Sequence, residues 1–258
     1  MKIIYLLFSF LFFATPLRAA VPERMIFKVD GVERHALVFA PTAGGHAKSP
    51  LIFGFHGHGG SPEASVRGMA FQNAWPDALV VYPQGLPIAT NVDPQGIKPG
   101  WQRSAGEVGD RDLKFVDQMV ATLREKYSID DHRIFAVGFS NGAFFTYLLW
   151  AQRPQLFTGF APVAGLFTFA GEPKVPKPAV LIGGERDQLV KIDKLQVAMR
   201  AVRRLNGCAE QGEACGPLCT RFASSKNAPL VNVIHPNGHI YPPRATQVIV
   251  DFFKTLPR

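Results

Sequence analysis

The chain reads Ile134-Phe135-Ala136-Val137-Gly138-Phe139-Ser140-Asn141-Gly142 near its centre, and this segment decides the fold. Its first four residues predict a buried strand, and the apolar residues after Gly142 predict a helix. A sharp turn between the two leaves no room for side chains at Gly138 and Gly142. It also lifts the Ser140 hydroxyl above the sheet, beside a helix N-terminus. We therefore predict that Ser140 is a nucleophile; the alternative is a serine that caps a helix at a tight turn.

Short apolar runs alternate with amphipathic ones along the rest of the chain. Val, Ile and Phe are frequent in the short runs, so strands are expected at residues 25–29, 35–39, 51–55, 78–82, 133–139, 159–163, 179–183 and 230–235. Helices are expected at residues 61–73, 113–126, 141–152, 193–205 and 245–254. This alternation predicts an α/β fold whose central sheet has about eight mainly parallel strands, with helices on both faces. The first two strands, joined at Asp30-Gly31, are expected to form an antiparallel hairpin.

Composition narrows the class of protein. The chain has 258 residues, of which 47% are hydrophobic and 19% are charged, so it is too apolar for a disordered protein. Its formal net charge of +8 is scattered, without a run of five basic residues, so no nucleic-acid partner is expected. We find no internal repeat or linker, and we expect one domain over residues 21–258. The least regular segments, residues 84–109 and 207–226, are candidates to border a binding site.

The first 20 residues have the pattern of a secretory signal peptide. Lys2 gives a positive start, residues 3–14 carry no charge, and small residues around Ala19 and Ala20 suit cleavage. The apolar run is shorter than the roughly 20 residues that a membrane-spanning helix needs. We therefore expect a secreted or periplasmic protein with no stable membrane insertion after cleavage; an uncleaved anchor is the alternative.

Three cysteines lie close together at Cys208, Cys215 and Cys219. In an exported chain they allow one disulfide and one free thiol. We prefer the pair Cys208–Cys219 because it closes the longest loop, although sequence leaves the connectivity open. A three-cysteine metal site is the alternative, but the paired CxxC spacing is missing.

A serine nucleophile needs a base, and in a strand-turn-helix context of this kind the base follows the nucleophile and the acid in the chain. Only His235 and His239 come after Ser140. His235 ends an expected strand, which favours a structural role. His239 lies in the loop between the last strand and the last helix, where its ring could swing over the sheet, so His239 is the predicted base.

The orienting acid should follow a strand between the nucleophile and the base. Residues 179–183 form that strand, and Glu185-Arg186-Asp187 follows it. We predict Asp187 as the acid, with Glu185 and Asp193 as alternatives, since a surface ion pair or a helix cap would explain any of the three.

Two backbone N–H groups are candidates for an oxyanion hole. One is that of Asn141, the residue after the nucleophile, and the other is that of His58, in the glycine-rich loop after the strand at residues 51–55. His56 and His58 could instead form a metal pair. No third ligand lies at a telling spacing, so neither a metal nor another cofactor is expected.

An ordered set of motifs carries a family resemblance. It consists of His56-Gly57-x-Gly59-Gly60-Ser61, Tyr82-Pro83-Gln84-Gly85 with Trp101, Asp112 before Phe115-Val116-Asp117, Gly138-x-Ser140-Asn141-Gly142, Ala161-Pro162-Val163-Ala164-Gly165 and Gly238-His239. Over most of residues 25–255 the chain resembles the secreted α/β-hydrolases of the polyhydroxybutyrate depolymerase and feruloyl esterase group. The resemblance implies the α/β-hydrolase fold and a Ser140–Asp187–His239 triad. It departs from the group at Gly183-Gly184-Glu185, where relatives often have His-Gly-Thr, and at Tyr241, where they often have Trp.

The expected function is therefore an exported serine carboxylic-ester hydrolase that acts on feruloyl-type or other short acyl esters. Trp101 and Tyr241 are candidates to stack on an aromatic acyl group, although Trp101 could be a core residue and Asp112 a helix cap. The expected partner is a small-molecule or polymeric ester. A polyhydroxybutyrate depolymerase, a serine peptidase and a non-catalytic surface-binding protein with a hydrolase fold are the alternatives.

Overall fold

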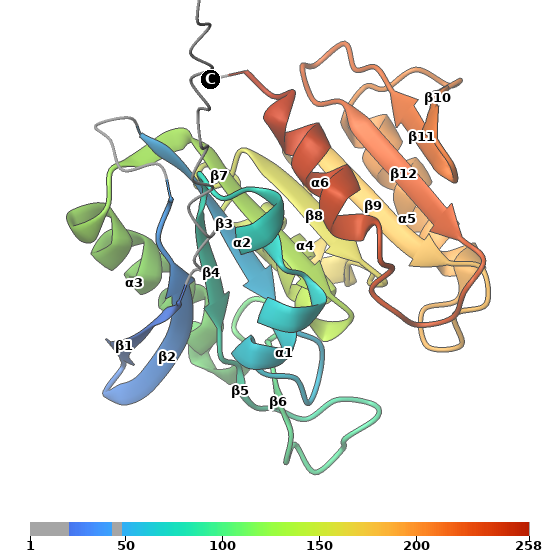
Figure 1. Ribbon diagram of the computed structural model, residues 1–258. Coiled ribbons are helices and arrows are strands. Elements are labelled where there is room, and N and C mark those ends of the chain that lie inside the picture. The colour runs from blue at the N-terminus through green and yellow to red at the C-terminus, as the bar shows by residue number, and fades with distance from the viewer. Residues whose placement is uncertain (1–20, 43–47, 258) are drawn as a thin grey trace, which may run out of the picture.

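The computed structural model describes residues 21–42 and 48–257, so the expected signal peptide, residues 1–20, lies outside the described residues. Strands and helices alternate along the chain as the sequence predicts (Figure 1). The strands are β1 (Glu23–Val29), β2 (Val32–Phe39), β3 (Ser49–Phe55), β4 (Leu79–Pro83), β5 (Leu86–Pro87), β6 (Pro99–Gly100), β7 (Ile129–Phe139), β8 (Gly159–Val163), β9 (Ala179–Gly184), β10 (Glu213–Gly216), β11 (Cys219–Phe222) and β12 (Leu230–His235). The α-helices are α1 (Pro62–Gly68), α2 (Phe71–Ala74), α3 (Arg111–Lys126), α4 (Asn141–Gln152), α5 (Ile192–Leu205) and α6 (Ala245–Lys254), with short 3₁₀ turns η1 (Glu107–Asp110) and η2 (Phe169–Gly171).

Ten strands form the central sheet, in the order β1-β2-β4-β3-β7-β8-β9-β12-β11-β10. The six from β4 to β12 pair in parallel, while β1, β2, β10 and β11 pair antiparallel at the two edges. All eight expected strands are present, and the predicted β1–β2 hairpin is confirmed. The sequence missed β10 and β11 because every residue of β10 is exposed and only two of the four residues of β11 are buried, so neither strand gives a clear apolar run.

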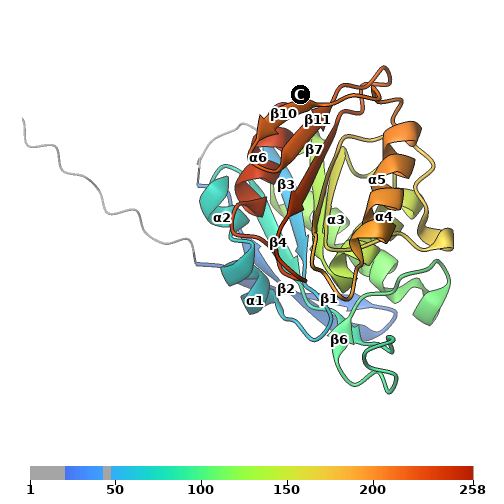
Figure 2. The same ribbon diagram turned by 90° about the vertical axis from the view of Figure 1, so that its right-hand side faces the viewer.

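Helices cover both faces of the sheet (Figure 2). On the face of α3, α4 and α5, the core includes Leu51, Phe53 and Phe55 of β3. On the face of α1, α2 and α6, it includes Ile52 of the same strand. Successive side chains of a strand point to opposite faces, so a strand that is apolar throughout serves both cores.

The helix expected from Ser61 toward Asn73 is two helices. Ser61 caps α1, with its Oγ accepting a hydrogen bond from the Ala64 N–H at 3.3 Å, and Pro62 begins the helix as predicted. The helix then ends before Ala70, whose φ of +49° lies in the left-handed region that a right-handed helix cannot continue through. This break brings the Phe71 N–H to the Tyr82 hydroxyl, 2.8 Å away on β4.

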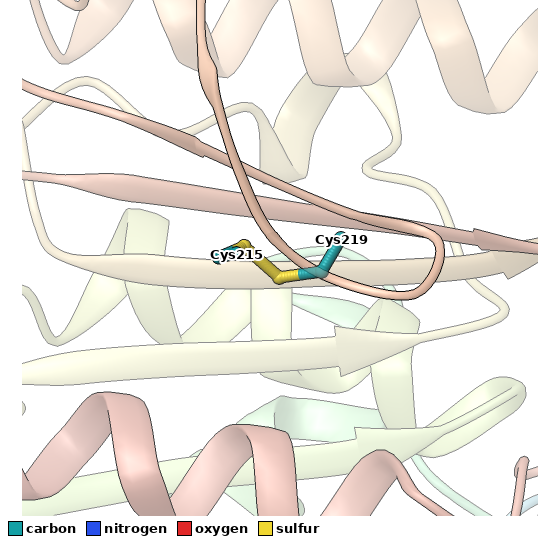
Figure 3. The surroundings of a disulfide bond; sticks show 2 residues. All are labelled: Cys215 and Cys219. Carbon is teal, nitrogen blue, oxygen red and sulfur yellow. A yellow bond between two sulfur atoms is a disulfide. The ribbon is translucent and has the colours of Figure 1, made fainter.

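The disulfide joins Cys215 and Cys219, so the expected Cys208–Cys219 pair is wrong (Figure 3). The two bonded cysteines lie on the β10–β11 hairpin, where their Cα atoms are 5.1 Å apart, a separation that suits a disulfide. Cys208 is a half-buried free thiol before the hairpin, where it pairs with Ser224 in an isolated bridge. Strand pairing, rather than loop length, therefore decides the connectivity, and it removes two sulfurs from any three-cysteine metal site.

Within residues 21–42 and 48–257, no helix is both long and apolar enough to cross a membrane. The same part of the chain contains no group of three or more His, Cys, Asp or Glu side chains that could hold a metal ion.

The disulfide can be tested by peptide mapping. Alkylation in denaturant without reduction should label Cys208 and leave a Cys215–Cys219 linked peptide. Replacing Cys215 and Cys219 with Ser should lower the free energy of unfolding by about 2 kcal/mol at most, because the bond closes a very short loop. Urea unfolding of the double variant and the parent protein measures this difference. A linked peptide that contains Cys208 would contradict the assignment.

Candidate active site

Ser140 lies on a strained turn between β7 and α4. Its φ of +54° is in the region that non-glycine residues rarely adopt. A Cβ at Gly138 would overlap the Gly142 carbonyl, and a Cβ at Gly142 would overlap the Phe55 carbonyl, so both positions exclude a side chain. The structure therefore has the strand-turn-helix geometry that the pentapeptide predicts, with the hydroxyl at the end of the sheet.

The structure brings Ser140, His239 and Asp187 together from three different loops. His239 Nε2 is 2.7 Å from Ser140 Oγ, and His239 Nδ1 is 2.7 Å from Asp187 Oδ2. His239 lies 99 positions after Ser140 and 52 positions after Asp187 in the chain. Parallel strands bring them together, because β7, β9 and β12 end at the same edge of the sheet.

Asp187 is held in place on the side away from His239. Its Oδ1 accepts hydrogen bonds from the N–H groups of Leu189 and Val190, each at 2.8 Å, and only 4% of the residue is exposed. The carboxylate is thereby fixed to receive the imidazole N–H through its other oxygen. Neither alternative acid, Glu185 or Asp193, has a hydrogen bond or ion pair with His239.

The loop after β3 lies against the nucleophile. A Cβ at Gly57 would be 3.3 Å from Ser140 Cβ, which is tighter than an ordinary contact, so glycine suits this close approach. In the described residues, the neighbouring His58 N–H donates to no acceptor, whereas the Gly59 and Gly60 N–H groups donate to Pro99 and Gly57. The Asn141 N–H is in the first turn of α4, where a helix has no internal acceptor. The two predicted oxyanion donors thus flank Ser140 with free N–H groups.

The side chain of Asn141 clamps the segment that contains Trp101. Asn141 Oδ1 accepts from the Trp101 N–H at 2.7 Å, and Asn141 Nδ2 donates to the Trp101 carbonyl at 3.0 Å. This two-way pairing fixes the start of α4 against the segment that follows β6. The sequence motif contains Asn141, but nothing in the sequence shows its partner.

Trp101 does not contact substrate, which contradicts the prediction from sequence. Its side chain is 0% exposed, packs against Phe55 and Phe145, and donates its indole N–H to the His56 carbonyl at 2.9 Å. It is a core residue that supports the loop after β3, as the alternative in the sequence analysis allowed.

Two pockets meet at His58, which lines both. The larger, about 330 Å³, lies between α1 and the loop after β3, and Phe139 and Tyr241 form its aromatic wall. The smaller, about 140 Å³, contains Ser140 and His239. Tyr241 is half-buried and lines the larger pocket, and its hydroxyl is 3.0 Å from Thr246 Oγ1. A contact between Tyr241 and substrate stays a prediction.

The segment between β5 and α3 forms a wall of the smaller pocket. Thr90, Asn91, Val92 and Arg103 line it, opposite Leu189 and Val190. Of the two irregular segments in the sequence, residues 84–109 therefore border the site, whereas residues 207–226 line neither of these two pockets. Sequence irregularity indicated the region, but no motif singled out the individual residues.

His56 and His58 serve different neighbours, which does not favour the alternative of a metal pair. His56 Nδ1 donates to the Gly57 carbonyl at 2.7 Å, and Nε2 accepts from the Gly85 N–H at 3.0 Å. His58 Nε2 is 3.0 Å from Asp93 Oδ2. Burial lowers the pKa of His56 from 6.5 to about 4, so the ring is neutral at physiological pH and both of its nitrogens hold the loop.

A buried ion pair between Arg34 and Asp112 holds the segment from Gln84 to Gln102. Arg34 Nη2 donates to Asp112 Oδ1 at 2.9 Å and to the Gln84 carbonyl at 3.0 Å, while Asp112 Oδ2 accepts from the Gln102 N–H at 2.9 Å. Asp112 is 0% exposed, so it does not reach either pocket. Its role is to hold the two ends of the 84–102 segment. The sequence placed Asp112 among the family motifs and offered a helix cap as the alternative.

Known esterases resemble this chain in sequence and in structure. No protein-family model matches the chain. The chain is 26% identical to a bifunctional acetylxylan esterase/xylanase of Neocallimastix patriciarum over 71% of its length, 28% identical to feruloyl esterase C of Emericella nidulans over 61%, and 29% identical to poly(3-hydroxyalkanoate) depolymerase C of Paucimonas lemoignei over 60%. The matched regions cover 26%, 56% and 39% of these relatives, respectively.

A solved structure, an acetyl xylan esterase from Aspergillus awamori, superposes with a TM-score of 0.69 over 86% of this chain and 94% of that one, at 14% identity. The chain has the α/β-hydrolase fold. In sequence it fits the polyhydroxybutyrate depolymerase and feruloyl esterase group that its motifs indicate.

The low pKa of His56 predicts a pH-dependent stability. The unfolded chain binds a proton on His56 below about pH 6.5, whereas the folded protein does so only near pH 4. The free energy of unfolding should therefore fall as the pH is lowered from about 6.5 to about 4. The contribution of His56 to this fall is roughly 3 kcal/mol, at about 1.4 kcal/mol per pH unit. The side chain in His56→Gln cannot titrate. Between pH 7 and pH 4.5, the free energy of unfolding measured in urea should therefore fall less in this variant than in the parent protein. Because burial also lowers the pKa values of His35 and His235, part of the fall should remain. An equal fall in the parent protein and in His56→Gln would contradict the low pKa of His56.

Proposed function

We propose that the chain is an exported serine carboxylic-ester hydrolase in which Ser140, His239 and Asp187 act as a triad. The observation that carries the proposal is the continuous hydrogen-bonded series from Ser140 Oγ through both nitrogens of His239 to Asp187 Oδ2, with each of its two distances at 2.7 Å. A serine hydroxyl is a weak nucleophile until a base takes its proton, and this geometry supplies the base and its orienting carboxylate.

In the acylation half of the reaction, Ser140 Oγ attacks the ester carbonyl carbon while His239 Nε2 accepts the hydroxyl proton. Asp187 stabilises the imidazolium through Nδ1–H. When the tetrahedral intermediate collapses, the bond to the alcohol oxygen breaks, and His239 gives its proton to that oxygen. The products of this half are the free alcohol and an acyl ester on Ser140.

In the deacylation half, His239 accepts a proton from a water molecule as the water oxygen attacks the acyl carbon. The bond to Ser140 Oγ then breaks, and His239 returns the proton to Oγ. The carboxylic acid leaves and the enzyme is regenerated, so one water is consumed for each ester and no cofactor takes part.

The N–H groups of His58 and Asn141 are the proposed oxyanion hole. Both flank Ser140, and neither has an acceptor to give up when the carbonyl oxygen becomes negative. The nearby supports, His56 and the Asn141 side chain, hold these donors rigidly before substrate binds. Donors that are fixed in advance need no reorganisation in the transition state.

The two pockets suggest how an ester lies in the site. His239 must reach the leaving oxygen, so the alcohol part belongs in the smaller pocket, which His239 lines. The acyl part then extends past His58 into the larger pocket, whose wall contains Phe139 and Tyr241. Aromatic walls favour a flat aromatic acyl group through offset or edge contacts. We therefore propose feruloyl-type or other short acyl esters as substrates, ahead of solid polyhydroxybutyrate.

Export is part of the proposal. Residues 1–20 have the pattern of a signal peptide, and the Cys215–Cys219 disulfide suits an oxidising compartment. We propose that residues 21–258 then form a single hydrolase domain, outside the cytoplasm and not inserted in a membrane.

Ser140→Ala and His239→Ala should each lower kcat by several orders of magnitude, because triad members act as a unit. Release of acid from methyl ferulate, 4-nitrophenyl acetate and hydroxybutyrate oligomers measures activity and ranks the acyl groups. A fluorophosphonate probe should label the parent protein at Ser140.

Circular dichroism of the two variants provides the control for folding. A folded Ser140→Ala protein with near-full activity would contradict the nucleophile. Absence of both labelling and turnover would favour a binding protein with a hydrolase fold. Turnover of solid polymer without turnover of methyl ferulate would contradict the proposed acyl preference.

The larger pocket can be filled from α1. Gly68 lines it, and an added Cβ at this position would meet no atom within 4 Å, so a side chain would project into open space. Gly68→Leu should lower kcat/KM for feruloyl esters by about tenfold or more, because the wall loses the room for a ring, and should spare acetyl esters. Arg67→Leu, at the exposed neighbouring position outside the pocket, is the matched control. Equal losses of kcat/KM for feruloyl and acetyl esters would contradict the placement of the acyl part in the larger pocket.

A further inference from the structure

We propose that Arg103 makes the site selective for esters whose alcohol part carries a carboxylate, that is, for acylated hydroxy acids. The inference rests on the proposed ester hydrolysis and on the placement of the alcohol part beside His239. It concerns the alcohol part of the ester, which the proposed acyl preference leaves open.

Arg103 is the cation in the wall of the pocket that contains Ser140 and His239. Among the ion pairs and side-chain hydrogen bonds of the described residues, none involves its guanidinium group. Most other arginines near the site are engaged: Arg34 binds Asp112, and Arg111 donates to the Pro87 carbonyl. A guanidinium at a pocket wall without a protein partner is available to a ligand.

The backbone of Arg103 is fixed on both sides. Its N–H donates to Glu107 Oε2 at 2.5 Å, and its carbonyl accepts from Thr168 Oγ1 at 3.0 Å. The Glu107 carboxylate also accepts from the Ser104 N–H at 3.1 Å, so this neighbouring acid is used by the backbone. The base of the Arg103 side chain is thereby held at the pocket, which lowers the entropy lost when the guanidinium binds an anion.

The rest of the pocket is suited to an anion. None of its lining residues is acidic, and the polar ones include Thr90 and Asn91. Thr90 Oγ1 is buried with no hydrogen-bond partner in the described residues, so its hydroxyl is free to turn toward a ligand. The nearest acid of the 90–98 loop, Asp93, already binds His58 and the Lys98 N–H. A carboxylate placed here would meet a cation and hydrogen-bond donors, while the nearby Asp93 and Asp187 carboxylates are already bound to His58 and His239.

The chemistry of the donor favours a carboxylate over a neutral hydroxyl group. A guanidinium presents its N–H groups in a planar fork that matches the two oxygens of a carboxylate, and charge-assisted hydrogen bonds are stronger than neutral ones. A small alcohol part fits the pocket volume of about 140 Å³. A short hydroxy acid, with its carboxylate close to the ester oxygen, meets both conditions.

The test compares two substrates that differ only in charge. Feruloyl glycolate has a carboxylate on its alcohol part, and feruloyl glycolamide replaces that carboxylate with a neutral amide of similar size. The full-length mature protein should hydrolyse the glycolate ester with a kcat/KM about tenfold higher, which is the scale of one charge-assisted contact that is partly exposed to water. Added salt should reduce this ratio, because the contact is partly solvated.

Arg103→Gln should bring the ratio of the two kcat/KM values close to one. The ratio, rather than either rate, is the readout, so a general loss of activity does not affect the conclusion. Arg103→Lys, which keeps the charge and loses the fork, should retain part of the ratio. Arg67→Gln removes one positive charge from exposed α1 and should keep the parent ratio, which controls for net charge.

Each outcome bears on one proposal. A parent ratio near one, with both esters hydrolysed, overturns the role of Arg103 and leaves the esterase proposal standing. A high ratio that Arg103→Gln preserves also overturns it, because another group must then recognise the carboxylate. Failure to hydrolyse both of these substrates, methyl ferulate and 4-nitrophenyl acetate counts against the esterase function itself.

Discussion

The positive φ of Ser140 is the constraint on which the rest of the site depends. A residue other than glycine in such a conformation costs on the order of 1–3 kcal/mol, so the surrounding structure must enforce it. Gly138 and Gly142 allow it by leaving room for the carbonyls of Gly142 and Phe55, and the apolar β7 and α4 enforce it by burial on either side. The strain has a chemical use, because it holds the hydroxyl at the edge of the sheet, where His239 can reach it.

The polar groups around this turn form a scaffold that is fixed without substrate. Neutral His56 ties the loop after β3 to Gly85, and Asn141 ties the start of α4 to Trp101. The buried Arg34–Asp112 pair then holds Gln84, which precedes Gly85, and Gln102, which follows Trp101. The His58 and Asn141 N–H groups, by contrast, have no acceptor among the described residues. Rigid support and free donors are what stabilisation of a developing oxyanion requires.

The two pockets divide the proposed substrate between different kinds of wall. Phe139 and Tyr241 give the larger pocket an aromatic surface, whereas Thr90, Asn91 and Arg103 give the smaller one polar groups and a positive charge. The α1–α2 break also contributes, because it ends α1 at Gly68 and leaves that position open to the larger pocket. Substrate choice thus depends on loops and helix ends, while the sheet supplies the reactive groups.

The sequence by itself indicated eight of the ten strands of the central sheet, the turn at Ser140 and His239 as the candidate base, because these depend on local periodicity and on the order of motifs. It left the acid open among Asp187, Glu185 and Asp193, and the tertiary structure places Asp187 next to His239. It could not determine the role of Trp101, since a large aromatic residue in a loop is compatible with both a core and a binding surface, and only packing against Phe55 and Phe145 decides between them. The disulfide depended on a hairpin whose first strand is fully exposed and leaves no apolar pattern. Arg103 belongs to no motif, and it becomes a candidate only because the tertiary structure places it, without a charged partner, in the pocket of Ser140.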